Sequence, residues 1–146
     1  PGPIARSAAP PTHPYLVASA ADAPLLDVID RQSHRIRQRL TLPGHERPCQ
    51  VVRFSADGEQ LVAIGDQEPL VTLFDDLLNP LGDIRVGNMP MDGCFTPDRQ
   101  QLLIANQDDG TLSVIDLAQR KVIATPRVGT GCEVLGYFPI GQINGR

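Results

Sequence analysis

The loop at residues 43–48 brings together the side chains of this sequence that are best suited to chemistry. A proline at each end restricts the backbone, so His45, Glu46 and Arg47 are expected to project from one place. A histidine in such company can act as a general base, a metal ligand or a haem ligand. A surface histidine, or one in a structural hydrogen-bond network, has the same appearance in a sequence, so both interpretations stay open.

Acidic side chains form the second candidate group. Asp108 and Asp109 precede Gly110, a context in which aspartate usually bonds nearby backbone amides in a tight turn. Contact with a metal or ligand is the alternative. An aspartate also recurs at one position of a repeated pattern, and the shared position predicts a structural role for Asp30, Asp75 and Asp116.

The cysteines and the known catalytic motifs offer little support for an enzyme. Cys49, Cys94 and Cys132 lack the CxxC spacing of a zinc site or disulfide framework. They fall on predicted inner strands, where a cysteine usually acts as a small buried hydrophobe. The sequence has no nucleophile elbow, P-loop, GxGxxG or HExxH motif, so cofactors and metals stay unknown and enzymatic activity stays an open question.

Composition narrows the class of protein and of partner. The chain has 146 residues, of which 41% are hydrophobic and 21% charged, as expected for one globular domain rather than a disordered chain. No apolar run approaches the roughly 18 residues that cross a bilayer. A net charge of -4 argues against nucleic acid, whose phosphates require clustered Lys and Arg. We therefore expect no membrane insertion and no nucleic-acid partner.

Internal repeats predict the architecture. A step of two apolar residues and an Asp occurs three times, at residues 28–30, 73–75 and 114–116, and a Phe-led turn occurs at 54–58 and again at 95–99. The spacing of about 40 residues, with short strands and no helical periodicity, is typical of β-propeller blades of four antiparallel strands. The prediction is an all-β chain of about three blades that forms an incomplete ring.

The strand prediction divides the chain into three parts. Residues 1–14 hold five prolines and are expected to form an arm or linker. Three propeller repeats are expected over 15–139 and a tail over 140–146. Short aliphatic runs between turn residues predict twelve strands, at 15–20, 25–30, 34–42, 48–55, 60–65, 70–75, 80–86, 91–96, 101–106, 111–116, 121–128 and 132–138.

A family resemblance supports these repeats. The third copy, with its Val-Gly turn at 86–87, Thr-Pro-Asp turn at 96–98, Leu-Ile-Ala-Asn strand at 103–106 and Val-Ile-Asp step at 114–116, resembles the YVTN-type β-propeller repeat. In the middle copy, Gly44-His45 at the start and Phe74-Asp75 at the end resemble a WD40 repeat, in which the His joins a hydrogen-bonded tetrad. The chain has no Trp and the other copies lack Gly-His, so the YVTN resemblance is preferred.

The resemblance implies a rigid disc whose loops recognise partners, so the leading function is a non-enzymatic binding or scaffold module. One alternative is a haem- or quinone-associated oxidoreductase or electron-transfer component of the periplasmic propeller type. Another is a lactonase-like propeller enzyme that uses calcium or carboxylates. The resemblance alone also implies a periplasmic or extracellular location.

Propeller ligands usually gather where blade-linking loops meet the loops between the two middle strands. On the strand map this face holds Asp22, His45, Glu46, Arg47, Asp66, Glu68, Asn88, Met89, Asp108 and Asp109, with Met91, Asp92 and Glu133 nearby. Acidic side chains predominate, so the face is expected to attract a cation or a basic protein. Arg35, Arg37 and Arg39 alternate along an outer strand, and alternation predicts one shared face that guards the sheet edge or docks an acidic partner.

Assembly is the last expectation. The twelve strands start at the second strand of a blade and end with the first strand of another. We therefore expect two copies to form a six-bladed ring, with each copy giving residues 132–138 to the first blade of the other. Pairing with another partial propeller, or a longer seven- or eight-bladed chain, is the alternative.

Overall fold

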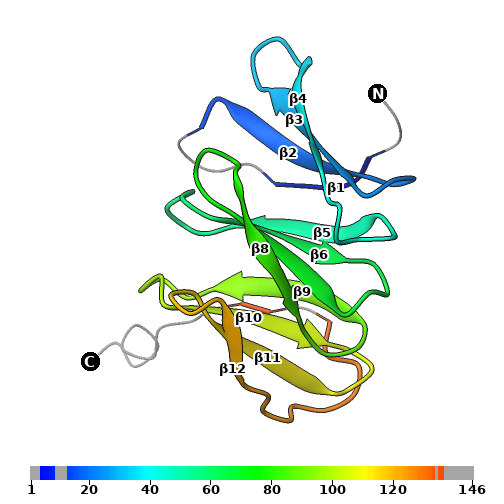
Figure 1. Cartoon of the computed structure of the whole chain (residues 1–146), viewed down its shortest axis with the longest axis vertical. Coiled ribbons are helices and arrows are strands. Elements are labelled where there is room, and N and C mark those ends of the chain that lie inside the picture. Colours follow the sequence, from blue (N-terminus) through cyan, green and yellow to red (C-terminus); the bar gives the residue numbers. More distant parts are fainter. Residues whose placement is uncertain (1–3, 9–12, 134, 137–146) are drawn as a thin grey trace.

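The computed structural model describes residues 4–8, 13–133, 135 and 136, and its twelve strands form three four-stranded antiparallel sheets stacked along the long axis of the molecule (Figure 1). Each sheet is built from four consecutive strands. Blade 1 contains β1 (Ile4–Ala8), β2 (Tyr15–Ala20), β3 (Leu25–Asp30) and β4 (Ile36–Thr41). Blade 2 contains β5 (Cys49–Phe54), β6 (Leu61–Gly65), β7 (Leu70–Phe74) and β8 (Pro80–Arg85). Blade 3 contains β9 (Pro90–Phe95), β10 (Gln101–Asn106), β11 (Thr111–Asp116) and β12 (Lys121–Ala124). The predicted fold class, an incomplete propeller of three blades, is confirmed.

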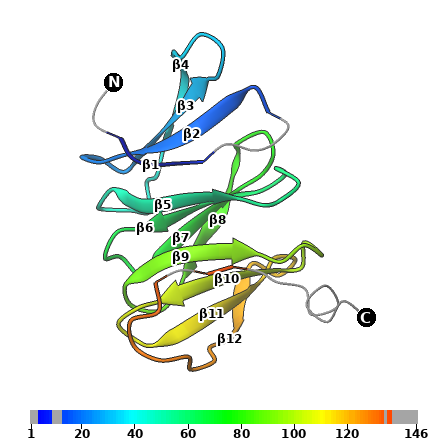
Figure 2. The same cartoon turned by 180° about the vertical axis from the view of Figure 1, so that it is seen from behind.

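The first strand of each blade lies on the inner side of the arc. β1 contacts β5, and β5 contacts β9, and the view from behind brings β5 and β9 forward (Figure 2). Within each blade the strands lie in the same order as in the chain, from the inner side of the arc to the outer side. The outer strands are therefore β4, β8 and β12. This arrangement returns the chain from an outer strand to the next inner strand through one blade-linking loop.

Burial along the strands follows from this stacking. Blade 2 is covered on both faces, and all five residues of β6 are accordingly buried. A strand covered on both faces must be apolar at consecutive positions, as the Leu-Val-Ala-Ile sequence of β6 is. Residues of β12, at the outside of the last blade, are exposed or half-buried.

Two apolar layers hold the blades together. Between blades 1 and 2 the buried side chains include Val17, Leu26, Val52, Leu61 and Phe74. Between blades 2 and 3 they include Val62, Ile64, Leu73, Leu102, Ile104 and Ile115. Full burial of one such aliphatic side chain is worth about 1.5–3 kcal/mol. Most of the stability therefore comes from contacts between blades.

A bulge repeated in each outer strand changes which way the side chains point. The register shifts between β3 and β4, between β7 and β8 and between β11 and β12 leave one residue of the outer strand unpaired, namely Arg37, Leu81 and Ile123. An unpaired residue reverses the alternation of faces beyond it. The outer strands of all three blades thus share one irregularity.

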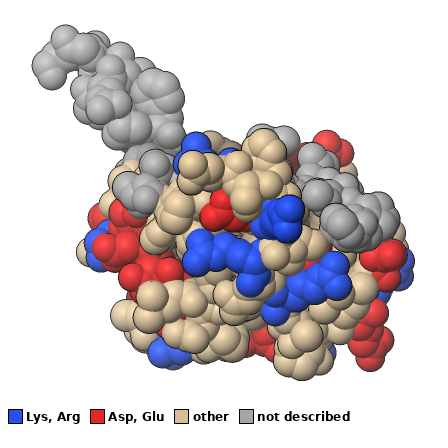
Figure 3. All heavy atoms as spheres, turned by 90° about the horizontal axis from the view of Figure 1, so that it is seen from above, with Lys and Arg blue, Asp and Glu red and all other residues tan. Residues whose placement is uncertain are grey.

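The arginines of β4 show the effect. The Arg37 guanidinium carbon lies 5.6 Å from the centre of the Tyr15 ring, in the layer between blades 1 and 2. Arg39 Nε instead pairs with Asp27 Oδ1 at 2.9 Å on the opposite face of the sheet, and Arg35 precedes the strand. The expectation that the three arginines share one face is therefore wrong. Seen from above, onto the open side of blade 1, Lys and Arg side chains still gather at the centre (Figure 3).

The ends of the chain differ from the sequence prediction. The first eleven expected strands correspond to β2 through β12, but the expected 121–128 strand ends at Ala124. Ile4–Ala8, expected within an arm, forms β1 and pairs with β2. The described residues of the expected last strand, Cys132, Glu133, Leu135 and Gly136, are not in a strand, and its remaining residues and the 140–146 tail lie outside the described part.

This pairing bears on the expected strand exchange. Ser7 pairs with Ala18 and Ala8 with Val17, so the edge of β2 that residues 132–138 of a second copy were expected to fill is occupied by β1 of the same chain. The exchange of the last strand is therefore wrong as a description of blade 1. Association of two copies without such an exchange stays a prediction.

Substitution of a leucine between the blades should cost far more stability than substitution of an exposed one. Leu61 is fully buried between blades 1 and 2, whereas Leu77 is 74% exposed. We expect Leu61→Ala to lower the free energy of unfolding by about 2–5 kcal/mol and Leu77→Ala by less than about 0.5 kcal/mol. Urea denaturation followed by circular dichroism measures both, and similar losses would contradict the packing described.

Candidate functional site

The blade-linking loops and the loops between middle strands meet on one side of the arc. Leu42 N donates to Pro24 O at 3.0 Å, Asp66 N to Pro48 O at 3.2 Å, and Gln107 N to Met89 O at 2.9 Å. Each bond joins a loop between middle strands to a blade-linking loop or its end. We call the surface formed by residues 21–24, 42–48, 66–69, 86–89 and 107–110 the loop face.

His45 lies beneath the loop face as part of the structure of blade 2. It is only 4% exposed. Its Nε2 is 2.8 Å from Thr72 Oγ1, and the Thr72 hydroxyl donates to Asp83 Oδ1 at 2.5 Å. Because that hydroxyl has one hydrogen, the His45 Nε2–H must be the donor to Thr72. The structural interpretation of His45, a buried network of the kind the Gly-His resemblance implies, is therefore the one that the contacts support.

Two carboxylates at equivalent positions hold the blade-linking loops. Glu68 accepts the Glu46 backbone N–H at 2.7 Å, and its other oxygen lies 3.2 Å from His45 Nδ1. Asp109, in the corresponding loop of blade 3, accepts the Asn88 backbone N–H at 2.8 Å and the Asn88 side-chain amide at 3.0 Å. We call these two residues the carboxylate clamps. Their oxygens are occupied by the protein itself, so they serve to position loops.

Asp92 and Glu133 are also engaged. Asp92 is 4% exposed, pairs with Arg53 Nε at 3.0 Å, and accepts the backbone N–H groups of Gly93 and Leu135. Glu133 accepts from the Gln107 amide at 2.6 Å. Both carboxylates therefore have hydrogen-bond partners within the protein, although they were expected near the ligand-binding face.

The rest of the expected face remains accessible. Three of its members, Asp66, Met89 and Met91, are half-buried. The exposed members are Asp22, Glu46, Arg47, Asn88 and Asp108. The side-chain carboxylates of Glu46 and Asp108 make no hydrogen bond or ion pair within the described part of the chain. The loop face thus presents fewer free acids than the sequence alone predicted, and they stand on a rigidly held surface.

The repeated aspartates have the structural role expected of them. Asp30 accepts the backbone N–H groups of Gln32 and Ser33, Asp75 accepts those of Leu77 and Asn79, and Asp116 accepts that of Gln119.

The turns after the first strands of blades 2 and 3 are also held by an aspartate that accepts hydrogen bonds within the turn. A hydrogen bond from Ser55, and then one from the Glu59 backbone, hold the pKa of Asp57 below its usual value, and Thr96 and the Gln100 backbone do the same for Asp98.

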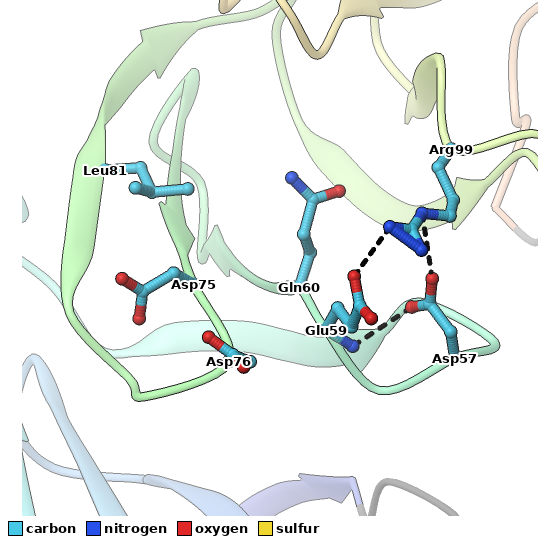
Figure 4. A pocket seen from close by; sticks show the side chains of 7 residues that line it. All are labelled: Asp57, Glu59, Gln60, Asp75, Asp76, Leu81 and Arg99. Carbon is cyan, nitrogen blue, oxygen red and sulfur yellow. Dashed lines mark hydrogen bonds and ion pairs between the residues drawn. The ribbon is translucent and has the colours of Figure 1, made fainter.

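A polar pocket of about 370 Å³ lies away from the loop face, among the turns at the other ends of the strands (Figure 4). Arg99 from blade 3 pairs there with Asp57 Oδ2 at 3.1 Å and Glu59 Oε2 at 2.7 Å. Asp75 and Asp76 line its other side (Figure 4). Sequence reasoning missed this pocket because its residues come from three turns, and only the repeat spacing of Asp57 and Asp98 pointed to them.

The cysteines occupy three different environments. Cys49 is 1% exposed in the layer between blades 1 and 2, and burial, followed by the nearby charges of Glu68 and Asp66, raises the pKa of its thiol to about 12. The expectation of a small buried hydrophobe is confirmed for Cys49. Cys94 is half-buried in β9, and Cys132 lies in an irregular segment rather than in an inner strand. Among the residues that the structure describes, no three His, Cys, Asp or Glu side chains are grouped as metal ligands.

Comparisons with known proteins support the fold alone. A chain of hydrazine synthase from Kuenenia stuttgartiensis is similar over 86% of this chain, with a TM-score of 0.75 and 15% identity. U3-55K is similar over 88%, with a TM-score of 0.75 and 18% identity. Both are known β-propeller proteins. The matched part spans 37% and 40% of those chains, about two fifths of their length.

No protein-family model and no curated protein matches the sequence. The class that fold and comparisons define is therefore that of β-propeller modules. The more specific YVTN resemblance stays a prediction. The described residues also contain no helix with the length and apolar character needed to cross a membrane.

Isosteric substitution of Thr72 should reveal the structural role of the His45 network. Thr72→Val removes the acceptor of His45 and the donor to Asp83 without changing side-chain shape. We expect a loss of about 1–3 kcal/mol in the free energy of unfolding, because buried polar partners lose their bonds. Thr41→Val, at an exposed position of β4, should change it by less than about 0.5 kcal/mol. Equal effects in denaturant titrations would show that the network contributes nothing to stability.

Proposed function

We propose that this chain is a β-propeller binding module whose loop face recognises a basic protein or another cationic partner. The observation that supports this most is the contrast among its acids. Glu68 and Asp109 are occupied as carboxylate clamps, whereas Glu46 and Asp108 are exposed and have no partner within the described residues. Free carboxylates on loops fixed in place lose little conformational freedom on binding a cation.

The charge of the loop face favours the same class of partner. Asp22, Glu46 and Asp108 are exposed there against Arg47, with Asp66 half-buried among them. Their combined negative potential would increase the encounter rate with a positively charged partner and would repel anionic polymers. No nucleic-acid partner and no membrane insertion are proposed.

The alternatives from the sequence stay predictions. Similarity to a hydrazine synthase chain at 15% identity extends to the fold, so it does not carry the activity that its name states. An oxidoreductase component with haem or quinone, a lactonase-like enzyme with calcium, and a periplasmic or extracellular location all rest on the family resemblance. The loop-face acids are the feature on which the binding function is proposed.

Neutralising the two free acids should weaken binding of a cationic probe. We expect the double variant Glu46→Gln/Asp108→Asn to bind a fluorescent oligolysine peptide about fivefold more weakly at low salt, since each exposed ion pair contributes about 0.5 kcal/mol. Fluorescence anisotropy measures the affinity. Added salt should reduce the difference, because screening weakens exposed pairs.

The matched control makes the same change in net charge away from the loop face. Glu59 and Asp76 line the pocket at the opposite ends of the strands, and Glu59→Gln/Asp76→Asn should keep an affinity close to that of the original chain. If both double variants lose affinity equally, the probe responds to net charge and the proposed role of the loop face is wrong.

We also propose that two copies associate through the open faces of their end blades. Alternation along the strands places Leu16, Leu25 and Ile29 on the outer face of blade 1, since their neighbours Val17, Leu26 and Val28 belong to the inner layer. By the same argument Leu103, Leu112 and Val114 lie on the outer face of blade 3. All six are half-buried. Blade 3 of one copy packed on blade 1 of the other, twice, would form a closed six-bladed ring.

Light scattering tests this association. We expect a mass of twice 15.8 kDa, and the variant Leu112→Arg should return to the mass of one chain, because a positive charge then meets the Lys and Arg side chains on the open side of blade 1. Leu77→Arg, at a 74% exposed position away from these faces, should leave the larger mass unchanged. A mass of 15.8 kDa for the original chain would exclude the proposed ring.

A further inference from the structure

A second pocket, of about 460 Å³, lies between blades 2 and 3 on their outer side. Its walls come from the end of β8, the start of β11, and the segment around β12. The lining side chains that matter for its chemistry are Arg85, Thr111, Ser113, Thr125 and Arg127, with Asp109 at one edge. The volume is within the range of about 300–1,000 Å³ typical of small-molecule sites.

The two arginines are available to a ligand. Both Arg85 and Arg127 are exposed, and the guanidinium groups make no hydrogen bond or ion pair with any residue in the described ranges. Asp109 is the acid that lines the pocket, but both of its oxygens accept hydrogen bonds from Asn88. Two positive charges therefore face a pocket whose carboxylate is already bound to the protein.

The hydroxyl groups add further donors. Ser113 is 1% exposed, and its Oγ accepts from Gly87 N at 3.2 Å and from Asn106 Nδ2 at 2.9 Å. Thr111 Oγ1 accepts from the same amide at 3.2 Å. With both hydroxyl oxygens acting as acceptors, each O–H hydrogen remains to be donated. Ser113 is a buried donor and requires an acceptor, which a ligand in the pocket can supply.

Gly87 keeps this arrangement compact. A Cβ atom at position 87 would lie 2.6 Å from Asn106 Cγ and 2.7 Å from Asp109 Oδ2. Only glycine lets the backbone N–H approach Ser113 while Asp109 holds Asn88. The glycine therefore lets the Gly87 backbone, Asn106 and Ser113 pack closely together.

The geometry points to an oxyanion site, in which a carboxylate or phosphate group binds between Arg85 and Arg127 and accepts hydrogen bonds from Ser113 and Thr111. Guanidinium groups match the paired oxygens of both kinds of anion. Glu46 and Glu68 lie beyond Arg85, in the adjoining pocket, and Glu68 is occupied by His45 and the Glu46 backbone. The site adjoins the loop face, since Gly87 and Asp109 belong to both, but it carries the opposite charge and does not depend on the function proposed for that face.

Titration calorimetry on the whole chain tests the site with inorganic phosphate and with succinate, each compared with chloride at equal ionic strength. We expect saturable binding of at least one anion, and a loss of at least tenfold in affinity in Arg85→Gln/Arg127→Gln, because two charge-assisted contacts are removed. Binding of phosphate alone identifies a phosphate site, and binding of succinate alone a carboxylate site.

Two further variants separate this site from other effects. Arg35→Gln/Arg47→Gln removes the same charge from exposed positions outside the pocket and should keep the original affinity. Glu46→Gln/Asp108→Asn, which tests the loop face, should not weaken anion binding. Equal losses in the two arginine double variants, or no binding beyond that of chloride, would overturn the oxyanion site.

Discussion

Face-to-face burial of the sheets is the constraint on which this structure depends. A single four-stranded sheet leaves both of its faces exposed to water, and only a neighbouring blade can cover each one. Blade 2 satisfies the constraint on both sides, which is why all five residues of β6 are buried. The loops follow from this stacking. Because neighbouring blades are held at a fixed spacing, one carboxylate in each of two blades can reach the blade-linking loop beside it, as Glu68 and Asp109 do.

The same stacking separates structural polar groups from those available for binding. His45, Asp92 and the two carboxylate clamps have partners within the protein, and their charges or donors are used to fix the loops. Glu46 and Asp108 on the loop face, and Arg85 and Arg127 in the pocket between blades 2 and 3, lack such partners in the described part of the chain. A rigid frame with unpaired charges at its surface is suited to recognition, and the two surfaces carry opposite charge.

Much of this fold could be predicted from the sequence, because the steps of two apolar residues and an Asp that end at Asp30, Asp75 and Asp116 indicate a strand and the turn after it. The arm was misassigned since its prolines outweighed the short Ile4–Ala8 run. A signal was available, because Ile4 lies 45 residues before Cys49. The same spacing separates Val28 from Leu73. The direction of Arg37 depends on a bulge that one sequence does not reveal. The roles of His45 and Glu68 depend on contacts across about 25 residues, which residue type alone cannot supply.

The central claim is that each blade is completed within one chain, with β1 as the inner strand of blade 1. Nuclear Overhauser effects between Ser7 and Ala18, and between Ala8 and Val17, test it directly in a mixture of isotope-labelled and unlabelled chains. The pairing of β1 with β2 predicts cross-strand signals only within a labelled chain. Signals between labelled and unlabelled chains, or pairing of β2 with residues 132–138 instead, would contradict the account.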